Sequence, residues 1–133
     1  MKANELMQYD WVCLEDDNTP RQVDWIRSGE VGLFWNQTVT PPYLEPVSLT
    51  QEILEKNGWE ECNASIEDND KQYGVTYGDF SFTWWRDARL LGCYRDSPTK
   101  GLYYEMITEL PIEYVHELQH ALKLCGIEKE IVV

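Results

Sequence analysis

Alternating hydrophobic and polar positions in the first third of the chain predict three consecutive antiparallel strands. The segments are residues 9–15, 21–27 and 31–37, and clusters of polar turn residues at 16–20 and 28–30 separate them. In the second segment Val23 and Trp25 point to one face of a strand. Such alternation is typical of a meander that buries one face and leaves the other in water.

A short helix is predicted over residues 50–57, where local end signals are clearest. Thr50 is a good N-cap, and Leu49 and Leu54 occupy the two positions of a hydrophobic staple. Gly58 suits the first position after the helix, where glycine adopts the left-handed conformation easily. The segment allows about two helical turns.

Aromatic and β-branched runs in the second half of the chain predict further antiparallel strands. Residues 59–66 have the composition of a strand, and residues 67–72 form a polar loop. Three or four strands then follow between residues 73 and 107, interrupted by glycines and by a polar break at 96–98.

A second, longer helix follows Pro111 and runs to Cys125, with Gly126 in the position that ends it. Its apolar residues recur every three or four positions and form one stripe: Val115, Leu118, Leu122 and Cys125. We expect this stripe to be buried against the sheet.

These elements predict a single α+β domain over residues 1–133. In it, a curved or split antiparallel sheet packs on the C-terminal helix, and the short helix covers one end. The N-terminal meander is similar to the opening of a small SH3-like barrel.

The last helix contains His116-Glu117-Leu118-Gln119-His120, which fits the zinc-peptidase pattern H-E-x-x-H. Residues four apart share a helix face, so both histidines could bind one zinc ion, with Glu117 as general base. A small zinc metallopeptidase using His116, Glu117 and His120 is therefore one hypothesis.

Two features weigh against a zinc site. The chain has two histidines, and the position where the extended motif places a third histidine ligand holds Gly126. On a helical wheel of ~100° per residue, the centre of the His116/His120 pair lies roughly 160° from the apolar stripe. We therefore expect the histidines to face solvent or a partner, with no bound metal or other cofactor.

Composition narrows the classes of partner. The net charge is −13, which disfavours direct binding of nucleic acid and favours a basic protein surface.

No apolar run approaches the ~20 residues of a membrane span, and the first residues lack an export signal, so we expect a cytoplasmic protein. The four cysteines lack metal-ligand spacing, and we expect reduced, mostly buried thiols.

Six tryptophans and eight tyrosines make the chain rich in aromatic residues. Trp84 and Trp85 are adjacent in a strand pattern, so they point to opposite faces and one of them should be outward. An outward tryptophan could anchor a protein partner or stack on a sugar, while core packing is the alternative. A sugar-binding module is therefore a further hypothesis.

The stretches MKANEL at residues 1–6, EPVSLTQEILEKNGW at 45–59 and YVHELQHALKLCGIEKEI at 114–131 stand in this order along the chain. Together they resemble segments of small uncharacterised proteins from gut-bacterial (Bacteroidetes-type) phages and integrated mobile elements. Those relatives usually have Gln and Asn where this chain has Glu117 and His120, which implies that the peptidase motif is accidental. The resemblance implies a phage or mobile-element accessory protein and no particular activity.

The leading prediction is a non-enzymatic acidic protein that binds a basic host protein surface, for example as an inhibitor of a host-defence protein. The high negative charge and the absence of a complete catalytic set lead to it. We expect the partner to contact Glu113, Glu117 and His120 on the last helix, and an outward tryptophan, Trp84 or Trp85. A helix is a rigid platform, so ordering it on binding costs little.

Overall fold

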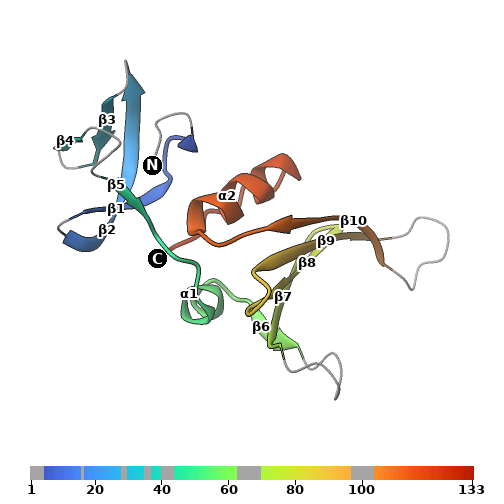
Figure 1. The fold of residues 1–133 in the computed structure, drawn as a ribbon. Coiled ribbons are helices and arrows are strands. Elements are labelled where there is room, and N and C mark those ends of the chain that lie inside the picture. The colour runs from blue at the N-terminus through green and yellow to red at the C-terminus, as the bar shows by residue number, and fades with distance from the viewer. Residues whose placement is uncertain are drawn as a thin grey trace.

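The computed structural model describes residues 5–15, 17–27, 30–34, 37–39, 44–62, 70–96 and 104–133. Within these residues the chain forms two five-stranded antiparallel sheets and two α-helices (Figure 1). The predicted α+β class is confirmed, and the sheet is split in two.

The N-terminal sheet contains the predicted meander and two further short strands. Its members are β1 (Trp11–Leu14), β2 (Asp17–Arg27), β3 (Glu30–Leu33), β4 (Gln37–Val39) and β5 (Leu44–Pro46), in the order β4-β3-β2-β1-β5. The buried side chains of this sheet form a small core of their own: Leu6, Val12, Val23, Val31, Leu33 and Leu44. Hydrophobic alternation therefore located these strands correctly.

The turn predicted over residues 16–20 is wrong for most of its length. Strand β2 begins at Asp17, whose Cα pairs with that of Leu14, so only two residues separate the paired positions. A two-residue hairpin loop needs few turn residues, and the remaining polar residues continue into the strand. Asp16 itself lies outside the described residues.

The C-terminal sheet is a continuous meander of β6 (Glu60–Cys62), β7 (Gln72–Tyr77), β8 (Phe80–Trp85), β9 (Leu90–Asp96) and β10 (Tyr104–Pro111), in the order β10-β9-β8-β7-β6. Gly78 has φ +61° in the two-residue turn between β7 and β8, a conformation that favours glycine. Three or four strands were predicted after residue 72, and the structure has four, although Gln72, expected in a loop, already belongs to β7.

Helix α1 (Gln51–Lys56) forms for the predicted local reasons. The Thr50 hydroxyl accepts a hydrogen bond from the Ile53 backbone N at 3.3 Å, and Gly58 has φ +87° just after the helix. Leu49 and Leu54 are fully buried. The N-cap, the staple and the ending glycine are all confirmed.

Helix α2 (Val115–Leu124) lies between the two sheets (Figure 1). Val115, Leu118 and Leu122 are fully buried in the larger core, together with the inner faces of β7, β8 and β9, and Cys125 packs partly buried against it. The predicted apolar stripe is confirmed. No helix in the described part of the chain is long and apolar enough to cross a membrane.

The last residues of the chain contact the N-terminal sheet and both helices. Ile131 is fully buried, and its carbonyl oxygen accepts a hydrogen bond from Trp11 Nε1 at 2.7 Å. The Asn57 side chain donates to the Val132 carbonyl at 2.7 Å and accepts from the Val132 N at 2.8 Å. The segment 127–133 therefore links the N-terminal sheet, α1 and α2.

Candidate functional site

The histidines of the H-E-x-x-H pattern lie on the first turns of α2 but do not face open solvent. His116 is 7% exposed, and the His120 side chain is 25% exposed. Their ring centroids are 5.6 Å apart, with the rings nearly perpendicular. The part of the prediction that places these histidines in solvent is wrong, because α2 is covered on two sides, whereas a helical wheel assumes one buried face. Their contact with a partner stays a prediction.

The second cover comes from the segment before β1, through Asp10. The Asp10 carboxylate is fully buried, and its oxygens lie 2.7 and 3.0 Å from His120 Nε2. The backbone N of Met7 also donates to Asp10, at 2.7 Å. An unpaired buried carboxylate would cost several kcal/mol, so the Asp10–His120 pair is a condition for this packing.

Glu117 has a structural role at the start of α2. Its Oε1 accepts hydrogen bonds from the backbone N of Glu113 and of Tyr114, each at 3.0 Å. This is the carboxylate half of a capping box, which satisfies free N–H groups at a helix start. Glu113 itself precedes the helix, which corrects its predicted position on the helix face.

These contacts bear on the zinc hypothesis. Binding of zinc through His120 Nε2 would have to break the pair with Asp10, and Glu117 already serves as a cap. Among the described residues, no three His, Cys, Asp or Glu side chains are grouped so that they could hold a metal ion. The geometry therefore disfavours a zinc peptidase site.

A pocket of about 710 Å³ opens beside the start of α2, and we call it the acidic pocket. Its lining residues come from the segment before β1, the end of β5 and the first turns of α2: Glu5, Met7, Pro46, Tyr114, His116, Glu117 and His120. Among the described residues, the lining contains two carboxylates and neither lysine nor arginine. The ring of Tyr114 stacks on that of His116, with centroids 5.9 Å apart.

Burial sets the charge state of His116 in this pocket. Desolvation lowers the pKa of His116 below its ordinary value of 6.5, and the neighbouring His120 lowers it further. The carboxylates of Asp10, Glu117 and Glu5 act in the opposite direction but do not outweigh burial. His116 is therefore neutral at pH 7, and the pocket keeps its negative character.

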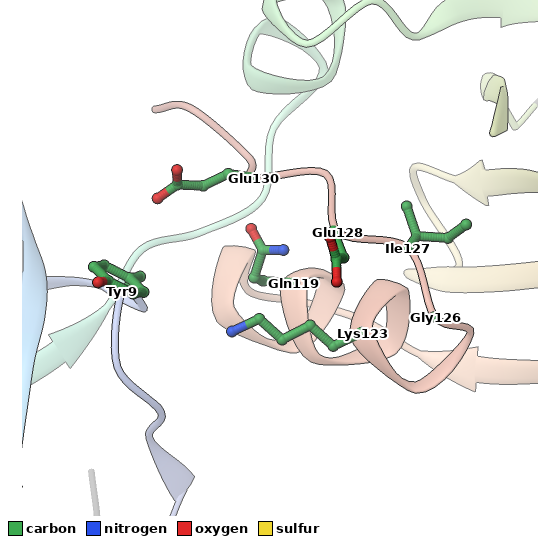
Figure 2. A pocket seen from close by; sticks show the side chains of 7 residues that line it. All are labelled: Tyr9, Gln119, Lys123, Gly126, Ile127, Glu128 and Glu130. Atoms are coloured by element: carbon green, nitrogen blue, oxygen red, sulfur yellow. The ribbon is translucent and has the colours of Figure 1, made fainter.

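A second hollow, the tail cleft, lies between α2, Tyr9 and the segment 126–130 (Figure 2). It measures about 440 Å³ and is lined by Tyr9, Gln119, Lys123, Gly126, Ile127, Glu128 and Glu130. The Gln119 side chain fixes one wall, since it donates to the Lys129 carbonyl at 2.8 Å and accepts from the Ile131 N at 2.7 Å. In Figure 2 Lys123 extends from α2 toward Tyr9, so this cleft carries both signs of charge.

Tyr9 has a strained backbone beside the tail cleft. Its φ of 72° lies in the left-handed region, which costs about 1–2 kcal/mol for a residue with a Cβ. The turn is held because the Tyr9 N donates to the Val23 carbonyl at 2.7 Å and the Asp10 N donates to the Met7 carbonyl at 3.1 Å. The ring is 47% exposed and stacks on Phe34. The buried Asp10 therefore also fixes the turn that presents Tyr9.

The prediction that one of the adjacent tryptophans points outward is confirmed. Trp84 is fully buried, and its Nε1 donates to the Ile112 carbonyl at 3.0 Å. Trp85 is half-buried on the opposite face of the C-terminal sheet. Trp84 is therefore a core residue and is removed from the predicted partner-binding set.

The structure brings together only some of the predicted site residues. Glu117 and His120 line the acidic pocket and Glu113 lies beside it, whereas Trp85 belongs to a different face of the molecule. Sequence reasoning missed Glu5 and Asp10 in this site. No local signal marks them, because Asp10 meets its partner 110 residues away.

Among the four cysteines, all free thiols, Cys93 is the buried one. Cys13 and Cys125 are partly buried and Cys62 is exposed, so the expectation of mostly buried thiols is wrong. Burial raises the pKa of the Cys93 thiol to about 11, so it stays protonated at neutral pH and reacts poorly.

No protein-family model, curated protein or solved structure matches this chain.

Metal analysis of protein purified without a histidine tag tests whether the H-E-x-x-H pattern binds zinc. We expect far less than stoichiometric zinc, because His120 Nε2 is held by Asp10 and Glu117 caps the helix. We expect the His120→Ala variant to contain no less zinc than the parent protein. Stoichiometric zinc that disappears in His120→Ala would contradict this assignment.

The depressed pKa of His116 predicts that acid destabilises the fold. At pH values between the lowered pKa of folded His116 and 6.5, the unfolded chain binds more protons than the folded chain. The contribution of His116 to the free energy of unfolding is therefore complete above pH 6.5 and is lost as pH falls. Urea unfolding across that range should show a weaker pH dependence for His116→Phe, which keeps a ring and cannot titrate. The same pH dependence in both proteins would show that His116 is not responsible.

Proposed function

We propose that this protein is a non-enzymatic binding protein, and that its acidic pocket receives a lysine or arginine side chain from a basic partner. The observation that supports this most is the lining of the pocket: among the described residues it includes the carboxylates of Glu5 and Glu117 and no lysine or arginine. A cation that enters such a pocket would gain charge-assisted hydrogen bonds.

Other lining residues suit the uncharged part of such a side chain. Met7 and Pro46 offer apolar contacts for the methylene groups of lysine or arginine. The face of the Tyr114 ring, stacked on His116, can attract a cation at close range. Glu117 uses Oε1 for the helix cap, and its Oε2 makes no hydrogen bond to a described residue.

The pocket walls are already ordered before a partner arrives. The Asp10–His120 pair fixes the segment before β1 against α2, and the capping bonds fix the Glu117 carboxylate. Binding to an ordered surface loses less conformational entropy than binding that must order a loop. The net charge of −13 would in addition attract a basic partner over a distance of about one Debye length, ~10 Å at moderate salt.

We further propose a setting for this binding, the cytoplasm of a bacterium in which a phage or mobile element propagates. The resemblance of three stretches of the chain supports this setting. A host-defence protein with a basic groove would suit the charge of the pocket, since neutralising such a groove is a direct route to inhibition.

Fluorescence anisotropy with a labelled peptide of alternating lysine and arginine tests the pocket. We expect Glu5→Gln to weaken binding about 5-fold, since a partly exposed ion pair contributes up to ~1 kcal/mol. The matched control is Glu55→Gln, which removes the same charge from the exposed side of α1. Both variants have equal net charge, so long-range attraction is the same in each.

Thermal unfolding of both variants checks that the fold is intact. Equal affinities for Glu5→Gln and Glu55→Gln would show that the pocket is not the binding site. Affinity that ignores ionic strength would contradict the electrostatic basis of the proposal.

A further inference from the structure

The C-terminal sheet has an outer face that neither helix covers. Both helices pack on its inner face, through buried side chains such as Tyr73, Phe82 and Trp84 (Figure 1). Across the outer face, strand register aligns one row of residues through all five strands: Glu60, Gly74, Thr83, Gly92 and Glu109. The middle of this row has only small side chains, and each end has a carboxylate.

Two aromatic side chains extend along this face over Gly92. A Cβ built on Gly92 would lie 2.9 Å from Trp85 Cζ3 and 2.8 Å from the Tyr94 hydroxyl. Trp85 pairs with Leu90, and Tyr94 lies on β9 itself. Since Leu90 and Tyr94 are each two residues from Gly92 along β9, the Cα atoms of Trp85 and Tyr94 lie roughly 6.6 Å from the row of Gly92. Both side chains must therefore run along the sheet surface to reach it.

Neither aromatic residue belongs to the protein core, and both are half-buried. The sheet around Gly92 contacts the edge of each ring, and both side chains remain partly exposed. Covering of a strand glycine by aromatic neighbours explains their contact with the sheet. Covering of the glycine does not account for the hydroxyl groups that flank the two rings.

A polar hollow of about 430 Å³ lies on the neighbouring strands of the C-terminal sheet. Its lining includes three hydroxyl side chains and two carboxylates: Thr76, Ser81, Thr83, Glu60 and Glu61. The three hydroxyls make no side-chain hydrogen bond to any residue that the structure describes. Each hydroxyl can act as a donor and as an acceptor toward a ligand in this hollow.

We propose that this outer face binds a neutral oligosaccharide. The exposed parts of the Trp85 and Tyr94 rings would stack on the C–H faces of sugar rings, while the hydroxyls and Glu60 would bond to sugar hydroxyls. The carboxylates at both ends of the row and the net charge of −13 would repel uronic acids and sulfated sugars. This site shares no residue with the acidic pocket, so the two proposals stand or fail separately.

Titration of the ¹⁵N-labelled protein with hexasaccharides tests the proposal. The panel contains neutral β-1,4-glucan, β-1,3-glucan, α-1,4-glucan, xylan and chitin hexamers, with a uronic acid hexamer as the charged comparison. We expect at least one neutral hexamer to shift the Trp85 indole signal, with a Kd around 1 mM, and the uronic acid hexamer to shift none.

Trp85→Ala should weaken binding of that hexamer about tenfold, which corresponds to ~1.4 kcal/mol and to the loss of one stacking contact. The matched control is Trp25→Ala, which removes a 38% exposed tryptophan from the other sheet and should leave binding unchanged. Thr83→Val, which keeps the shape of the side chain and removes one hydroxyl, should weaken binding without altering the fold.

The proposal is wrong if no neutral hexamer shifts the Trp85 signal at about 10 mM, well above the expected Kd. It is also wrong if Trp85→Ala and Thr83→Val, both folded by their amide spectra, bind as the parent protein does. Binding of the basic peptide would be unaffected by either result.

Discussion

The fully buried carboxylate of Asp10 is the interaction on which the arrangement of this molecule depends. A carboxylate with no exposed surface needs a partner, and His120 of α2 supplies one at 2.7 Å. The N-terminal sheet has a small core of its own, and the larger core surrounds the opposite face of α2. The Asp10–His120 pair therefore joins two packed units across a helix that both of them cover.

This constraint explains why a helix with a peptidase-like motif forms a different kind of site. His120 is paired with Asp10 and Glu117 caps the helix, so both have structural roles, while His116 is buried and neutral. The acidic pocket, which we propose as the site of the partner, lies between these residues and Glu5. The contacts made by the motif residues also hold the walls of the pocket in place.

Sequence reasoning predicted the features that depend on neighbours along the chain. Thr50 with Leu49 and Leu54 predicted α1, and the stripe through Val115, Leu118 and Leu122 predicted the main buried face of α2. It failed where contacts join distant segments, because a helical wheel cannot show that a second layer covers the opposite face. Strand alternation predicted that one of Trp84 and Trp85 points outward, but the choice between them required the structure, in which Trp84 packs in the core.

A double-mutant cycle on Asp10 and His120 tests the central claim most directly. Urea unfolding of the parent protein, Asp10→Ala, His120→Ala and the double variant gives the coupling free energy of the pair. The bond from the Met7 N to Asp10 is lost in both the single Asp10 variant and the double variant, so it cancels. Our account predicts a coupling of about 1–3 kcal/mol, as for a buried charge-assisted hydrogen bond. Additive effects within about 0.5 kcal/mol would show that the pair does not join the two units.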